Sequence, residues 1–95
     1  MTSNIRAKLR SIAMKLEPST QVGKNGIGET LIKQVDEQLQ SHELIKIAVL
    51  KNADVDAKDV AEELAEATSS EVVQVIGSKI TLYRYSTKQG IKHIL

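Results

Sequence analysis

Apolar residues recur at helical spacing in three stretches of the chain, and each stretch predicts an amphipathic helix. The first covers residues 5–16 and ends before Pro18, because a proline forces the residue before it out of the helical region. The second covers residues 27–39 and ends near His42. The third has its buried face over residues 60–65. The residues predicted to cap the first and third helices are Thr2 or Ser3 and Asp54 or Asp56.

Four further segments have the pattern of β-strands. Residues 19–22 form a short extended piece, and residues 44–50 are apolar on both faces, which is typical of a strand in the middle of a sheet. Residues 72–76 and 80–85 are β-rich runs, and the turn at 77–79 between them contains a glycine that indicates a tight hairpin. The order α-β-α-β-α-β-β predicts an α/β fold, in which helices pack on a mixed four-stranded sheet.

The chain of 95 residues has room for one domain with one core. We therefore predict a single domain over residues 1–95, with its core over about residues 5–85 and a partly ordered tail over residues 86–95. Apolar residues make up 41% and charged residues 26%, which is ordinary for a folded soluble protein. The longest apolar run, residues 47–50, is too short for a membrane span or a signal peptide. A cytoplasmic protein without a membrane partner is expected.

Composition and spacing argue against several kinds of site. The chain has no cysteine, which excludes disulfides, thiolate metal sites and thiol nucleophiles. Its two histidines, His42 and His93, lie 51 positions apart, so a histidine-rich metal centre is not expected. Three aspartates at positions 54, 56 and 59 lack the glycine and the closing glutamate of a calcium loop. No metal, cofactor or catalytic residue is predicted, and His42 is expected to interact with the last carbonyl groups of its helix.

Charge is distributed unevenly along the chain, although the net charge is only +1. Residues 1–24 carry five basic side chains and one acidic, residues 25–71 carry four basic and eleven acidic, and residues 72–95 carry four basic and none acidic. If the two basic ends meet in the folded protein, they form the positive face expected of a protein that binds a polyanion. If they lie apart, the asymmetry says little about function.

Three of the five glycines, at positions 23, 26 and 28, lie in a short loop that runs into the second predicted helix. Within this loop, Gly23–Gly26 reads Gly-Lys-Asn-Gly, and the backbone N–H groups of such a loop can face an anion. The spacings of a P-loop and of a dinucleotide-binding loop are both absent. The spacing G-x-x-G is the one that clamps a nucleic-acid backbone in KH domains. The alternative is a turn that uses glycine for its geometry and leaves its lysine in solvent.

Together with two other motifs, this loop resembles the CRM domain family, the chloroplast RNA splicing and ribosome maturation domain, in its single-domain bacterial YhbY-like form. The first motif is Gln21–Gly26, the second is His42–Lys46, and the third combines Val75–Gly77 with Leu82–Arg84. The three occur in the order and at the spacing of the family, and the resemblance covers roughly residues 5–85.

The resemblance implies an RNA-binding α/β domain similar to the C-terminal domain of translation initiation factor three, with a KH-like glycine loop. Stand-alone bacterial members are associated with the large ribosomal subunit precursor, which implies ribosomal RNA as the partner and a role in ribosome assembly. It implies no enzymatic activity and no small-molecule substrate, and a monomer is expected. Carried onto this chain, the loop presents Lys24 as a point charge for phosphate and Asn25 as a hydrogen-bonding amide.

Four other basic residues are candidates for RNA contacts. Lys79 and Arg84 belong to the last hairpin, where Arg84 is equally able to pair with an acid of the central segment. Arg6 and Arg10 lie beside the apolar stripe of the first helix, where they extend the basic face or are simply solvated.

The two tyrosines, Tyr83 and Tyr85, point to the same face of one predicted strand. A stacking platform uses several exposed aromatic residues on adjacent strands, and this chain has no phenylalanine or tryptophan. Stacking on bases is the alternative, but both tyrosines are expected to be buried with their hydroxyl groups at the edge. Recognition of particular bases is expected to be weak compared with recognition of phosphate and shape.

Two other functions stay open from the sequence. The acidic segment Asp54–Glu66 can dock a basic partner such as a ribosomal protein, which would make the chain a protein-interaction module. The glycine loop can instead hold the phosphate of a nucleotide in a small enzyme, although no nucleophile and base at suitable spacing support that activity.

Overall fold

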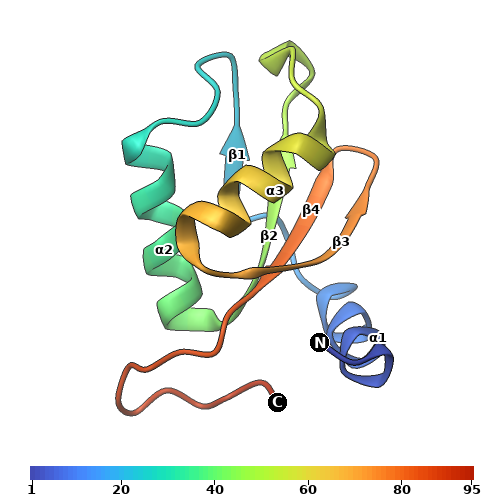
Figure 1. Ribbon diagram of the computed structural model, residues 1–95, viewed down its shortest axis with the longest axis vertical. Helices are drawn as coiled ribbons and strands as arrows, with labels where there is room; N and C mark the ends of the chain where they lie inside the picture. Colours follow the sequence, from blue (N-terminus) through green and yellow to red (C-terminus); the bar gives the residue numbers. More distant parts are fainter.

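The computed structural model describes residues 1–95 and shows three helices and four strands in the predicted order (Figure 1). The elements are α1 (Ser3–Ala13), β1 (Thr20–Val22), α2 (Glu29–His42), β2 (Leu44–Val49), the short 3-10 helix η1 (Lys51–Ala53), α3 (Ala57–Thr68), β3 (Glu71–Ile76) and β4 (Lys79–Tyr83). The predicted α/β fold with a mixed four-stranded sheet is confirmed. None of the three α-helices combines the length and the apolar composition needed to cross a membrane.

The strands lie in the order β1-β2-β4-β3. β1 and β2 are parallel and are connected through α2, whereas the other neighbouring pairs are antiparallel. Val22 of β1 lies beside Val49 at the end of β2, and Leu44 at the start of β2 lies beside Tyr83 at the end of β4. The sheet therefore has two different ends, which we call the Val49 end and the Leu44 end.

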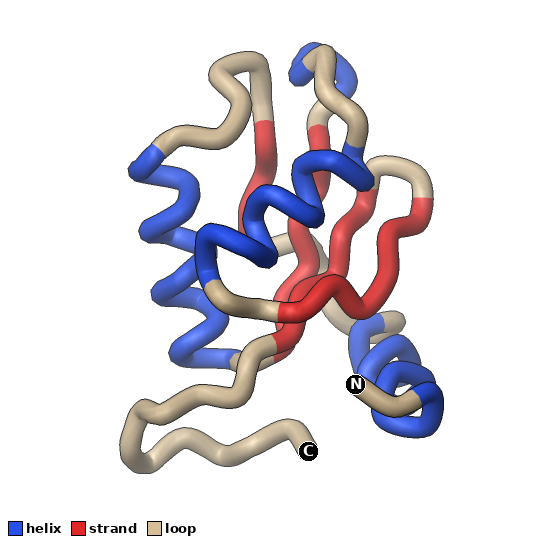
Figure 2. Tube along the Cα trace, in the orientation of Figure 1, coloured by secondary structure: helices blue, strands red, loops and turns tan.

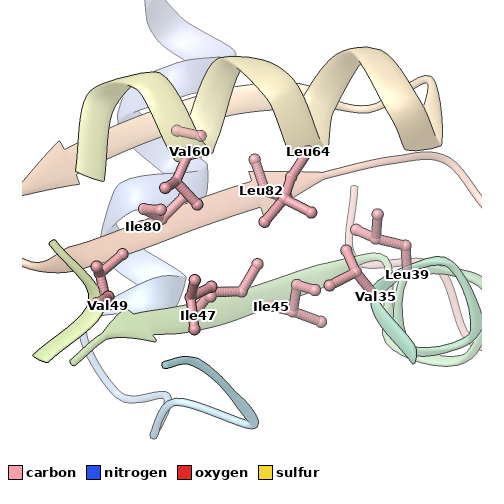
Figure 3. Close-up of a cluster of buried hydrophobic side chains, with 12 residues drawn as sticks. Val35, Leu39, Ile45, Ile47, Val49, Val60, Leu64, Ile80 and Leu82 are labelled. Carbon is pink, nitrogen blue, oxygen red and sulfur yellow. The ribbon is translucent and has the colours of Figure 1, made fainter. Parts of the chain in front are cut away.

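Helices α2 and α3 cover one face of the sheet and bury the larger core (Figure 3). Alternate strand residues face these helices, because successive side chains of a strand point to opposite faces. The twelve buried residues of this cluster are Val22, Val35, Leu39, Ile45, Ile47, Val49, Ala53, Val60, Ala61, Leu64, Ile80 and Leu82. Removing one buried leucine from such a core costs about 2–5 kcal/mol, so the cluster holds the two helices firmly on the sheet.

Helix α1 packs on the opposite face of the sheet, at its Leu44 end (Figure 1). Its buried residues join a second cluster, which we call the α1 cluster: Leu9, Ala13, Leu44, Val73 and Tyr83. The helix begins as predicted, with the hydroxyl of Thr2 accepting a hydrogen bond from the amide of Ile5 (3.2 Å).

Several predicted boundaries differ from the structure, the strand boundaries mostly by one residue. The first helix ends at Ala13 instead of residue 16, because the residues after it tighten into single turns with hydrogen bonds between positions three apart. The second helix begins at Glu29 instead of residue 27, after Gly28 in an extended conformation. The last strand ends at Tyr83, two residues earlier than predicted.

Residues 86–95, predicted as a tail, form no helix or strand (Figure 2). They nevertheless fold back on the domain, and Ile94 packs against the α1 cluster. The two ends of the chain consequently both lie toward the Leu44 end of the sheet (Figure 1).

Candidate nucleic-acid interface

Three loops lie together at the Val49 end of the sheet (Figure 1). They cover residues 23–28, 50–56 and 77–78. Backbone hydrogen bonds connect them where the strands end: the amide of Leu50 donates to the carbonyl of Val22, and the amide of Val49 donates to the carbonyl of Ser78, both at 2.8 Å. The glycine loop is therefore one part of a surface built from three segments far apart in the sequence.

The four residues of the G-x-x-G motif form a tight turn at the end of β1. The amide of Gly26 donates a hydrogen bond to the carbonyl of Gly23 (3.0 Å), which closes the turn. Lys24 and Asn25 occupy its two central positions, and both are exposed. The turn thus presents one positive charge and one amide group to solvent, next to backbone that carries no side chain.

The turn depends to different degrees on its two glycines. Gly26 has a φ of +68°, in the left-handed region where other residues are strained. Gly23 has no such φ, and a Cβ built there would lie 3.7 Å from Cδ1 of Leu50, an ordinary contact distance. The fold therefore requires glycine at position 26 but accepts a side chain at position 23.

Each of the three loops carries or adjoins an exposed lysine. These are Lys24 in the glycine loop, Lys51 at the start of η1 and Lys79 directly after the β3–β4 turn. Lys79 alternates with Ile80, which faces α2 and α3, so it lies on the opposite face of the sheet. Lys51 was not among the predicted residues, because in the sequence it belongs to the acidic central segment.

The α3 side of the glycine loop is acidic. A groove there is lined by Gly26, Ile27, Val55 and Val60 and by the acidic residues Asp54, Asp56, Asp59 and Glu63. Asp56 also caps α3 as predicted, since its carboxylate accepts a hydrogen bond from the amide of Lys58 (2.9 Å). A polyanion is repelled from these carboxylates, so the favourable approach to the turn is from the side away from α3.

Arg84, a predicted candidate for RNA contacts, is engaged within the protein. Its Nη1 donates to Oδ1 of Asp36 (2.5 Å) and to the carbonyl of Thr68 (2.7 Å), and its Nη2 donates to the carbonyl of Asp36 (2.9 Å). The side chain is only 17% exposed. Of its two expected roles, the structure shows the pairing with an acid of the central segment.

Helix α1 and the last residues of the chain both pack at the Leu44 end, away from the glycine loop (Figure 1), whereas Lys24 and Lys79, which also belong to the basic ends, lie at the Val49 end. Nη1 of Arg6 in α1 donates to the carbonyl groups of Val72 and Val73 (2.7 and 2.9 Å), where the register of β3 is interrupted. Arg10 is exposed in the last turn of α1, where a positive charge suits the helix dipole. Arg6 and Arg10 therefore do not adjoin Lys24 in one compact site.

Glu43 organises the Leu44 end of the sheet. It is fully buried, and its φ of +65° lies in the left-handed region. Its Oε2 accepts hydrogen bonds from the amide of Ser86 and from Nδ1 of His93, both at 2.7 Å, and its Oε1 accepts one from the amide of Ile94 (2.8 Å). Burial raises the pKa of this carboxyl, but the hydrogen bonds outweigh burial and the pKa lies below its ordinary value of 4.5.

The prediction that both tyrosines are buried is wrong for Tyr85. Tyr83 is 9% exposed within the α1 cluster, whereas Tyr85 is 61% exposed. Because β4 ends at Tyr83, the alternation of the strand does not extend to Tyr85. The ring of Tyr85 stacks instead on that of His93. Burial, and next to it the charge of Glu43, raises the pKa of Tyr83 above 10.0.

Comparisons with known proteins agree with this fold. The CRS1/YhbY (CRM) domain matches residues 1–84. "Probable RNA-binding protein YqeI" from Bacillus subtilis is 45% identical over 86 residues, which cover 90% of each chain. "Probable RNA-binding protein MJ0652" from Methanocaldococcus jannaschii is 45% identical over 97 residues, which cover all of this chain and 70% of that protein. The solution structure of the Staphylococcus aureus protein SAV1595, described as a candidate RNA-binding protein, has a TM-score of 0.78 and 49% identity over 94% of this chain and 93% of that one.

Proposed function

Because the chain belongs to the CRS1/YhbY (CRM) domain family, we propose that it is an RNA-binding protein that docks the RNA backbone at the Gly23–Gly26 turn. Its relatives are named as RNA-binding proteins. The observation that carries the proposal is the exposed turn with Lys24 and Asn25 at its tip, beside the loops of Lys51 and Lys79. Each of the three adjoining loops carries or adjoins an exposed lysine, which can meet the phosphates of a nucleic acid.

The turn binds through charge and backbone access. Lys24 attracts a phosphate as a point charge, and the amide of Asn25 donates a hydrogen bond to a phosphate or sugar oxygen. The glycines at both ends of the turn carry no side chain, and the RNA comes close to the main chain there. These contacts are made to phosphate and sugar and recognise no particular base. Because phosphates are neutralised, the slope of log affinity against log salt is about −0.7 to −0.9 for each phosphate.

The proposal extends to the finer points that the family resemblance implies. The RNA is ribosomal RNA of the large-subunit precursor, and the protein assists ribosome assembly as a cytoplasmic monomer without enzymatic activity, cofactor or small-molecule substrate. The fold is similar to the C-terminal domain of translation initiation factor three, and the turn acts as a KH-like G-x-x-G clamp. Arg6, Arg10 and Arg84 stand outside the three loops and act on RNA only as part of the general positive field.

The decisive experiment compares the native protein with the double variant Lys24→Asp and Asn25→Asp. Binding to purified large-subunit precursors and to naked ribosomal RNA is measured across a salt series, after circular dichroism has shown that each protein is folded. The matched control is Lys33→Asp with Gln34→Asp, which makes the same charge change in an exposed lysine–amide pair of α2. The turn variant should lose binding and the α2 variant should keep it. If the turn variant binds as tightly as the native protein, the loop is an ordinary turn with no part in RNA binding.

A second candidate function follows from the acidic groove between the glycine loop and α3. Four acidic residues line it, which suits a basic protein partner. Reversing Asp59 and Glu63 to lysine should abolish the capture of such a partner and should not weaken RNA binding. Loss of RNA binding in that variant would contradict the separation of the two surfaces.

A further inference from the structure

One aromatic feature has no part in the contact proposed at the glycine loop. The rings of Tyr85 and His93 are stacked at the Leu44 end, with centroids 4.4 Å apart and 9° between their planes. One face of the Tyr85 ring lies against the imidazole, and the residue as a whole remains 61% exposed. The chain has no phenylalanine or tryptophan, and its other tyrosine is buried. Tyr85 is therefore its one large aromatic surface open to solvent.

The segments that carry the stacked pair are both hydrogen-bonded to a single buried carboxylate. Glu43 accepts hydrogen bonds from the ring of His93 and from the amide of Ile94, the residue that follows it. It also accepts one from the amide of Ser86, the residue that follows Tyr85. Both rings are thus anchored through their own segments to the same side chain. A ligand that stacks on Tyr85 loses little affinity to ordering, because the surface already exists.

The chemistry of this surface favours a nucleobase. Unpaired bases of RNA stack on tyrosine and histidine side chains, and every base has a π-face, so the contact tolerates any sequence. The segment that carries His93 also carries Lys88 and Lys92 and no acidic residue. Phosphates on either side of a stacked base would meet positive charge there instead of repulsion.

We propose that the Tyr85–His93 pair is a stacking site for one unpaired base of the bound RNA. This inference rests on the proposed RNA binding and adds a contact to a base, where the glycine loop contacts only the backbone. The two sites lie at opposite ends of β2, and Leu44–Val49 spans about 17 Å at 3.3–3.4 Å per residue. An RNA that fills both therefore runs along the sheet and is unpaired at the Leu44 end.

Two probes of equal length separate the base from the backbone: an oligouridylate and a ribose-phosphate chain that lacks bases. Tyr85→Leu should weaken binding of the oligouridylate roughly 5- to 150-fold, the range for one stacked base, and should not change binding of the abasic chain. Tyr85→Phe keeps a ring and should bind both probes as the native protein does. Val55→Ala removes an exposed apolar side chain on the acidic side of the glycine loop and serves as the control.

Tyrosine fluorescence gives a second measurement that a purely structural role would not change. In Tyr83→Phe, Tyr85 is the sole tyrosine emitter, and the oligouridylate should quench it while the abasic chain should not. If that variant does not fold, the native protein gives the same comparison, because the buried Tyr83 contributes a background that is equal for both probes.

The outcomes distinguish this inference from the function it rests on. Equal losses on both probes in Tyr85→Leu, or no quenching specific to the base, would overturn the stacking site. If Lys24→Asp with Asn25→Asp then still abolishes binding, the proposed function stands without it. If the loop variant binds normally while Tyr85→Leu loses its preference for the oligouridylate, the stacking site stands and the glycine-loop contact fails. Binding of neither probe by the native protein would overturn both.

Discussion

Arg84 and Asp36 form an ion pair that joins the end of β4 to the middle of α2, with Nη1 and Oδ1 2.5 Å apart. The same guanidinium donates to the carbonyl of Thr68, at the end of α3. One side chain therefore ties the last strand to both helices of the larger core. Its donors reach the carbonyl groups of Asp36 and Thr68, and these contacts account for its low exposure.

Replacing this arginine should reduce stability more than RNA binding. Arg84→Gln should lower the free energy of unfolding by about 1–3 kcal/mol, because it leaves the carbonyl of Thr68 and the backbone of Asp36 without their charged donor. The ion pair itself contributes little of this, since Asp36 is 54% exposed. Urea titration measures the change, and Lys79→Gln, at an exposed position, should stay within about 0.5 kcal/mol of the native protein.

Unchanged stability of Arg84→Gln together with weakened RNA binding would show that the guanidinium leaves its internal partners to contact RNA. That result would restore Arg84 to the candidate interface.

The hydrogen bonds to Glu43 predict how stability depends on pH. They hold the pKa of the folded carboxyl below 4.5, its ordinary value, although burial acts in the opposite direction. The ionised group therefore stabilises the folded state above pH 4.5, and this contribution is lost as the pH falls through the folded pKa. Glu43→Gln should be less stable than the native protein near neutral pH, and the difference should shrink below pH 4.5. Urea titrations at several pH values measure it.

A difference between Glu43→Gln and the native protein that is the same at every pH would contradict the assigned role of the ionised carboxylate. His93→Gln, which keeps the two backbone hydrogen bonds to Glu43, should show a smaller effect of the same sign.

Local patterns in the sequence were sufficient for the element order, the sheet and the exposed turn. Helical and strand periods, Pro18 and the glycines act over a few residues, so they can be read directly from the chain. The role of Glu43 could not be predicted in this way, because its partner His93 is 50 positions away and no period connects them. Lys51 was hidden for a similar reason: in the sequence it belongs to the acidic central segment, and only the fold brings its loop next to the glycine loop at the Val49 end.

The two glycines of the turn should respond differently to alanine. Gly26→Ala should cost about 1–2 kcal/mol of stability, because alanine is strained at a φ of +68°. Gly23→Ala should change stability by no more than about 0.5 kcal/mol, since its Cβ meets only Leu50 at an ordinary distance. If RNA approaches the backbone there, Gly23→Ala should nevertheless lower affinity about tenfold, as the loss of one hydrogen bond to a charged group implies.

Thermal or urea unfolding and a filter-binding titration of the same Gly23→Ala preparation make this test. A stable Gly23→Ala protein with native affinity would show that the RNA does not come close to the main chain at this position.

The acidic residues beside α3 predict the side from which RNA approaches the turn. Lys51 and Lys58 are both exposed and lie seven positions apart. Lys51 shares a groove with Asp54 and Asp56 but belongs to the loops at the Val49 end, whereas Lys58 lies on α3 with Asp56 and Glu62. Lys51→Glu should weaken RNA binding and reduce the slope of log affinity against log salt by about 0.7–0.9, the contribution of one phosphate. Lys58→Glu makes the same charge change and should leave the slope unaltered, because phosphates avoid that side. Titrations from low to moderate salt measure both slopes. Equal reductions would mean that RNA responds only to total charge, and a reduction in Lys58→Glu alone would place the RNA on the α3 side of the loop.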